Sequence, residues 1–200
     1  MALELSITNI LHLISLISPI LISFFLIMSS LFNVDIKAII YLMGVLIASI
    51  LNIFLKNIIK QNKFEDEAYS CNILDIPYDG KYNSPSSSSV FIAFTMVYLL
   101  LPMVSNNTIN YGVIIFFLCI FCVDAYSKIM KRCTNYAGAL FGLVVGFISG
   151  IVWYVILDGS GNSDLLYFDE LKSNKTLCSR PSKQNFKCKV YKNGEVIGAI

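Results

Sequence analysis

The sequence predicts an all-α protein, a multi-pass bundle of about five transmembrane helices with a small C-terminal β-hairpin tail. Three observations support this fold class. Of the 200 residues, 56% are hydrophobic and only 14% are charged, whereas about a quarter of the residues in a soluble domain are charged. Five apolar stretches have about the length, roughly 20 residues, that a helix needs to cross a bilayer. After residue 157 the composition becomes abruptly polar.

The five predicted spans are residues 7–32, 38–55, 88–104, 111–127 and 135–157. The fourth is short and contains Asp124, whereas the fifth carries no charge. The amino terminus has Glu4 in place of the basic flank of a secretory signal, and its apolar run is too long for a cleaved signal, so we expect the first span to be retained. Residues 1–157 therefore form the predicted transmembrane domain.

Residues 158–200 are predicted to form an extramembrane tail. It opens with a flexible Gly/Ser-rich linker over residues 158–164, and Asn193-Gly194 between two alternating runs predicts a β-hairpin. An isolated hairpin is only marginally stable in water, so we expect this one to dock on a partner protein. Cys178 and Cys188 form a disulfide in this tail or remain two free thiols.

The charge balance excludes several functions. With 15 Lys+Arg against 13 Asp+Glu, the chain is too evenly charged for a nucleic-acid-binding module. No cysteine spacing suggests zinc, and we expect neither a metal nor a cofactor. A channel or transporter is disfavoured because only Asp124 and Lys128 place charge in or near a span, and no internal repeat is evident.

The basic residues predict an orientation. Five crossings place residues 56–87 and 128–134 on one face and the tail on the other. The first face carries Lys56, Lys60, Lys63, Lys81, Lys128, Lys131 and Arg132, whereas the short loops of the other face carry only Lys37. The positive-inside rule makes the first face cytosolic. The sequons at Asn106 and Asn174 then fall on the opposite, lumenal face.

Three short motifs stand at the ends of the spans. Lys56 is followed seven residues later by Lys63 and a phenylalanine, and Pro85 is followed by a run of serines that opens the third span. Ser127-Lys128 is followed by Thr134 and then Gly138 at the start of the fifth span. Each motif is weak alone, but their order and their positions at span ends form a pattern.

This pattern resembles the three motifs of the type 2 phosphatidic acid phosphatase superfamily, particularly its dolichyl diphosphate phosphatase branch. The family motifs are K-x6-R-P, P-S-[GS]-H and S-R-x5-H-x3-D, and the resemblance covers about residues 56–154. It implies a helical core around a phosphate site. The family usually has six helices, so one is missing or replaced in this five-span chain.

The resemblance also implies that the catalytic groups are lost. In the family, the third-motif histidine attacks phosphorus, an aspartate orients it, and the second-motif histidine protonates the leaving oxygen. The matching positions here are Thr134, Gly138 and Ser88. Threonine without a base is a poor nucleophile and serine is no acid near neutral pH, so we expect no enzyme. The single histidine, His12, is predicted to lie between helices or at the interface, without reaching this site.

Anion binding could survive this loss. Lys56, Lys63, Ser86, Ser87 and Lys128 would surround the amino terminus of the third helix, where backbone N–H groups favour a phosphate. A different interpretation makes the lysines membrane-flanking anchors, with Lys128 paired to Asp124 one turn away, and makes the serines helix caps. Both interpretations remain open from the sequence.

The fifth span carries a stripe of small residues. Gly138, Gly142, Gly146 and Gly150 repeat every four residues and share one helical face. Such a stripe lets a second helix approach closely inside lipid. Either an internal neighbour or a second copy could fill it, and we favour the internal neighbour.

Two functions fit the sequence. One is a non-catalytic membrane scaffold whose tail tethers a partner protein. Its Ile/Asn/Lys/Ser-rich composition resembles membrane proteins of large DNA viruses, in which it would lie in the internal virion membrane and bind capsid proteins. The other is a protein that binds a lipid phosphate or diphosphate headgroup, or an atypical lipid phosphatase. The bilayer is a partner in both cases.

Overall fold

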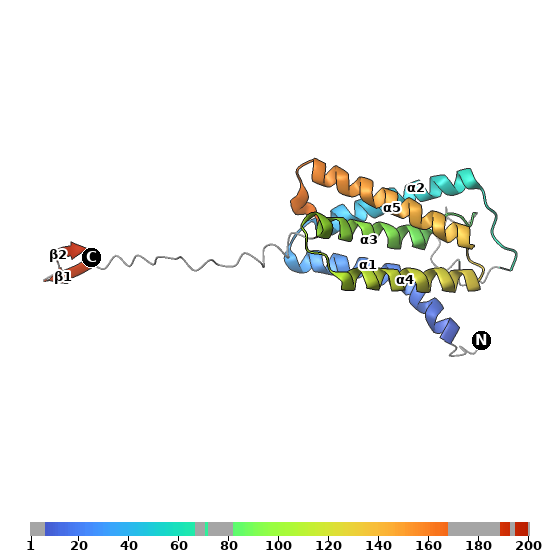
Figure 1. The fold of residues 1–200 in the computed structure, drawn as a ribbon, viewed down its shortest axis with the longest axis horizontal. Coiled ribbons are helices and arrows are strands. Elements are labelled where there is room, and N and C mark those ends of the chain that lie inside the picture. The colour runs from blue at the N-terminus through green and yellow to red at the C-terminus, as the bar shows by residue number, and fades with distance from the viewer. Residues whose placement is uncertain (1–6, 67–70, 72–81, 168–188, 193–194, 200) are drawn as a thin grey trace. The chain divides into compact units, whose positions relative to one another are not determined.

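The computed structural model describes residues 7–66, 71, 82–167, 189–192 and 195–199. Two compact units are present, Met1–Asp169 and Glu170–Ile200. The first unit is a helical bundle, shown in Figure 1 with its helices side by side. Its helices are α1 (Ile7–Asn33), α2 (Lys37–Ile59), α3 (Ser87–Ser105), α4 (Tyr111–Met130) and α5 (Tyr136–Gly159).

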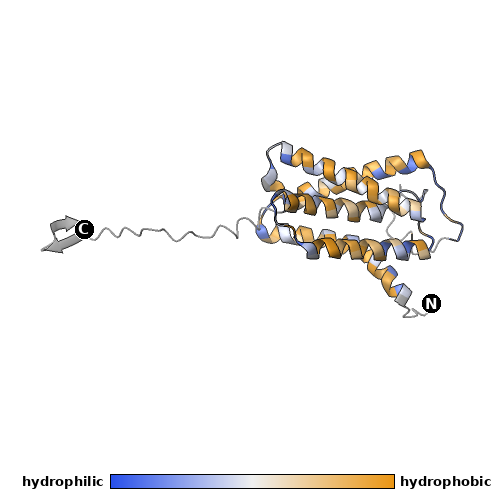
Figure 2. Ribbon diagram, viewed as in Figure 1, coloured by the Kyte–Doolittle hydropathy of each residue, from blue (hydrophilic) through white to orange (hydrophobic). Residues whose placement is uncertain are grey.

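All five helices are long and apolar enough to cross a membrane. The five predicted helices are therefore present, and their length and composition fit a multi-pass membrane protein. Figure 2 shows that apolar residues dominate each helix of the bundle. Large apolar side chains such as Phe25 and Leu140 are exposed on the outside, whereas Ser15, Thr95 and Asp124 are buried inside. Such an inverted pattern is expected where lipid replaces water as the solvent.

Two helices continue past their predicted ends. The predicted second and fourth spans stop at residues 55 and 127, before a lysine in each case. Instead α2 continues through Lys56 to Ile59, and α4 continues through Lys128 to Met130. Lys56 is only 7% exposed and Lys128 is also largely covered, because both point into the bundle. A charge that faces the interior does not end a helix, so these predicted boundaries were too short.

Helix α3 lies in the interior of the bundle and packs closely against α5. A Cβ atom on Gly146 would lie 2.3 Å from the carbonyl oxygen of Val90, and one on Gly142 would lie 2.7 Å from that of Ser86. Gly150 similarly faces Val97 of α3. Helix α3 is therefore the internal neighbour that packs against the glycine face of α5. Gly138 instead lies against Thr134 and Asn135, in the turn before α5.

The chain after α5 packs back on the bundle. The predicted flexible linker, residues 158–164, contains the last turn of α5 and most of a short 3-10 helix, η2 (Ser163–Leu165). Leu166 is buried, and the Tyr167 hydroxyl donates to the carbonyl oxygen of Leu26 at 2.6 Å. The ring of Tyr167 also meets those of Tyr41 and Tyr98 edge-on. The transmembrane unit thus extends beyond residue 157.

In the second unit, β1 (Lys189–Lys192) pairs antiparallel with β2 (Glu195–Ala199). The Asn193-Gly194 turn predicted between them lies outside the described residues. So do Cys178, Cys188 and the sequon at Asn174. The hairpin as a docking element and the tail disulfide stay predictions.

Candidate anion-binding site

The predicted site lies at one end of the bundle, where α2 and α4 end and α3 and α5 begin. The backbone N–H of Ser86 donates to the carbonyl oxygen of Gly138 at 3.0 Å and ties the starts of α3 and α5 together. The 19 residues of α3 span roughly 28 Å, close to the thickness of a bilayer core. When α3 crosses a membrane, its first turn lies at the depth of the lipid headgroups.

A pocket of about 50 Å³ opens at this end. All five residues predicted to bind phosphate line the pocket, together with Thr134. No acidic side chain is among its described lining residues. The lining residues are Lys56, Lys63, Cys71, Tyr82, Asn83, Ser86, Ser87, Lys128, Cys133 and Thr134. The three lysines give the described wall of the pocket positive charge, part of which is balanced by Asp124 beside Lys128.

On one side of the pocket, Lys56 is held against the start of α3. Its ammonium donates to the Ser87 hydroxyl at 2.9 Å, and the Asn52 amide donates to the same oxygen at 3.0 Å. Both residues lie on α2, one turn apart. The two contacts fix the positive charge of Lys56 beside the helix amino terminus.

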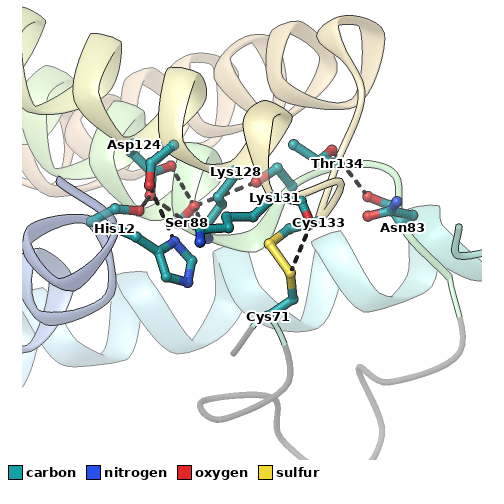
Figure 3. Close-up of a disulfide and its surroundings, with 12 residues drawn as sticks. His12, Cys71, Asn83, Ser88, Asp124, Lys128, Lys131, Cys133 and Thr134 are labelled. Atoms are coloured by element: carbon teal, nitrogen blue, oxygen red, sulfur yellow. Dashed lines mark hydrogen bonds and ion pairs between the residues drawn. A yellow bond between two sulfur atoms is a disulfide. The ribbon is translucent and has the colours of Figure 1, made fainter. Parts of the chain in front are cut away.

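On the other side, Lys128 belongs to a buried polar cluster (Figure 3). The Asp124 carboxylate is fully buried; it accepts hydrogen bonds from Ser15 and Ser88, both at 2.6 Å. Lys128 donates to the Ser88 hydroxyl and lies 3.7 Å from the nearer Asp124 oxygen. The predicted pairing of Lys128 with Asp124 is therefore present. It coexists with the pocket, because Lys128 also lines the pocket wall.

Asn83 supplies an unsatisfied donor. Its backbone N–H is fixed by the Gln61 carbonyl at 2.9 Å, and its side chain is 93% buried, with 7% exposed, where it lines the pocket. The side-chain nitrogen has no hydrogen-bond partner. A buried amide donor without a partner costs free energy.

The serines at the start of α3 do not act as the predicted caps. Ser86 occupies the N-cap position but makes no capping hydrogen bond with its side chain. Its hydroxyl instead lies 3.4 Å from that of Ser88. The first backbone N–H groups of a helix have no acceptor within the helix. An anion at this position would therefore meet the positive end of the α3 dipole.

The position that resembles the family nucleophile is bonded to the backbone. The Thr134 hydroxyl donates to the carbonyl oxygen of Asn83 at 3.4 Å and is buried. No histidine or carboxylate is among the described residues that line the pocket. The lining residues offer charge pairing and hydrogen bonding to an anion.

His12 lies between helices, as expected. It is buried on α1, and its Nδ1 lies 3.1 Å from the Ser127 hydroxyl of α4. Because α1 packs against α4, His12 joins the edge of the Asp124 cluster. It does not line the pocket. Its contact with Ser127 joins two helices.

A disulfide between Cys71 and Cys133 was not predicted. Both cysteines line the pocket, and their Cα atoms lie 5.4 Å apart. The sequence did contain a signal, since both residues fall in loops assigned to the same face of the membrane.

Comparisons of the chain with protein-family models, curated proteins and solved structures find no match. The resemblance to the phosphatase superfamily therefore stays a prediction, and the function must be inferred from the pocket itself.

Proposed function

We propose that this membrane protein binds the phosphate group of a lipid in the pocket formed by Lys56, Lys63 and Lys128, and that it does not hydrolyse it. The observation that carries the proposal is the convergence of three lysines at a helix amino terminus. Ammonium groups, amide donors and a helix amino terminus are the groups that bind phosphate in proteins.

The size and depth of the pocket favour a single phosphate on a lipid. A buried water needs about 10–15 Å³ of such space, so a volume of about 50 Å³ holds about three to five oxygen-sized positions. That fits the oxygens of one phosphate and leaves no room for a large headgroup. The position at the end of α3, at headgroup depth, favours a lipid over a phosphate free in water.

Lys63→Gln should weaken binding of a lipid phosphate about tenfold, because one charge-assisted contact contributes roughly 1.5–3 kcal/mol. Lys56→Gln should do the same. The measurement is native mass spectrometry of delipidated protein titrated with a short-chain phosphatidic acid. Separate titrations with the matching diacylglycerol and with inorganic phosphate distinguish lipid recognition from binding of phosphate alone.

The matched control is Lys60→Gln, because Lys60 ends α2 between the two test positions but does not line the pocket. It should bind like the unchanged protein. An equal loss of affinity in all three variants would mean that the general positive charge of the surface attracts the lipid. The proposal of a specific pocket would then lose its support. Equal affinity for diacylglycerol and phosphatidic acid would do the same.

The purified protein should release no inorganic phosphate from phosphatidic acid or from an isoprenoid diphosphate above background. The reason is that no histidine or carboxylate lies beside Thr134 among the described residues that line the pocket. A colorimetric phosphate assay over several hours is sufficient. Release that Thr134→Ala abolishes would show that the site is an enzyme after all.

Other parts of the proposal rest on the sequence alone. The basic loops make the pocket end cytosolic and the tail lumenal under the positive-inside rule. The scaffold function, the tether to a capsid protein and the virion membrane depend on the tail and on composition. They rank below phosphate binding because no contact within the described residues supports them.

A further inference from the structure

We propose that the Cys71–Cys133 pair makes phosphate binding depend on redox state, with the disulfide form binding more tightly than the dithiol form. This inference rests on the proposed function, since it concerns the same pocket. Both cysteines line that pocket, and no role was assigned to either of them above.

The position of Cys133 connects the disulfide to the binding groups. It lies in the turn between α4 and α5, immediately before Thr134, and only 9% of it is exposed. Its backbone N–H donates to the carbonyl oxygen of Lys128 at 2.8 Å. Cys133 is thus bonded covalently to Thr134 and hydrogen-bonded to Lys128, and both residues belong to the pocket wall. A displacement of Cys133 would therefore displace both.

Breaking the bond frees the two sides of the wall to move apart. Reduction removes the covalent tie between Cys71 and the turn before α5. In a pocket of about 50 Å³, a displacement of about 1 Å is enough to take a donor out of hydrogen-bond range of a bound phosphate. The disulfide also pre-organises the wall and so lowers the entropy lost on binding.

The redox step balances with glutathione disulfide as the oxidant. One cysteine thiolate attacks glutathione disulfide, forms a mixed disulfide and releases one glutathione. The second cysteine thiolate then attacks the protein sulfur of the mixed disulfide and releases the other glutathione. The two cysteine thiols lose two electrons and two protons, and the two glutathione molecules receive them.

This proposal reconciles the disulfide with the predicted orientation. Glutathione keeps most cytosolic thiols reduced, and the disulfides that do form there are usually transient and redox-sensing. A pair on the predicted cytosolic face would then be a dithiol at rest and a disulfide under oxidation. Binding of the lipid phosphate would rise with oxidation.

The test uses the full chain with Cys119, Cys122, Cys178 and Cys188 changed to serine, so that reagents act only on the remaining pair. The protein is equilibrated with glutathione disulfide or with reduced glutathione and titrated with short-chain phosphatidic acid, and separately with inorganic phosphate. We expect reduction to weaken phosphatidic acid binding about three- to tenfold. Adding Cys71→Ser and Cys133→Ser should give the weaker affinity in both buffers, with unchanged helical circular dichroism.

The outcomes separate the two proposals. Equal affinity of the oxidised and reduced protein overturns the redox proposal and leaves phosphate binding intact. Absence of binding in both states overturns the proposed function and the redox proposal together. A redox effect that persists in the Cys71→Ser, Cys133→Ser variant also overturns the redox proposal, because it assigns the effect to another group.

Discussion

Replacing Gly146 with leucine should prevent α3 and α5 from packing and should leave little folded protein in detergent. A single Cβ at this position would already lie 2.3 Å from the Val90 carbonyl oxygen and 2.8 Å from the Ala93 Cβ. The first obstacle is backbone, so it cannot rotate away. Even Gly146→Ala should therefore lower the free energy of unfolding by about 1–3 kcal/mol. The thermal unfolding midpoint in detergent measures the effect.

Gly159 offers a control on the same helix. A Cβ there would meet nothing within 4 Å, so Gly159→Ala should leave the midpoint unchanged. If Gly146→Ala and Gly159→Ala melt at the same temperature as the unchanged protein, the close approach of α3 and α5 is wrong. The anion pocket would then lose its structural support, because the packing of α3 against α5 holds the starts of these two helices together.

Asp124→Asn should lower the free energy of unfolding, with the second largest effect that we expect. Asp124 is fully buried and pairs with Lys128, while Ser15 and Ser88 donate to its two oxygens. Removing one partner of a buried ion pair costs about 3–5 kcal/mol, because the other charge is left without compensation. We expect about 3 kcal/mol here, since Lys128 keeps some access to solvent. The change is measured by the shift in unfolding midpoint and in steady-state yield.

The exposed ion pair of Asp66 and Arg132 is the matched control. Asp66→Asn should cost about 0–1 kcal/mol, as exposed pairs do. The double variant Asp124→Asn, Lys128→Met should recover part of the loss, because it removes both buried charges together. Equal effects of Asp124→Asn and Asp66→Asn would show that the Asp124 cluster does not hold the helices together.

Much of the bundle could be predicted from the sequence, because membrane spans depend on the length and apolar character of a run. The ends of the helices could not be predicted as well from the sequence. The predicted spans stop just before Lys56 and Lys128, yet both lysines point into the bundle and the helices continue past them. A charge inside a membrane protein is compatible with a helix when it finds a partner, and such partners come from other helices and are invisible to a hydropathy pattern.

The site was also predicted in part. The motif pattern placed Lys56, Lys63 and Lys128 near the start of α3, and the structure gathers them around one pocket. The unpartnered amide of Asn83 and the Cys71–Cys133 pair were missed, because both depend on contacts between segments far apart in the chain. The position of His12 between helices was predicted, but its contact with Ser127 was not, since this contact depends on the packing of α1 against α4.

The most direct test of phosphate binding is the proximity of lysine nitrogen to lipid phosphorus. Protein labelled with ¹⁵N-lysine is placed in bilayers of phosphatidylcholine with a small fraction of phosphatidic acid, and ¹⁵N–³¹P dipolar coupling is recorded by solid-state NMR. We expect strong coupling for the lysine signals that Lys56→Gln and Lys63→Gln remove, and only when phosphatidic acid is present. Coupling confined to other lysines, or unchanged when phosphatidic acid is omitted, would contradict a phosphate site in this pocket.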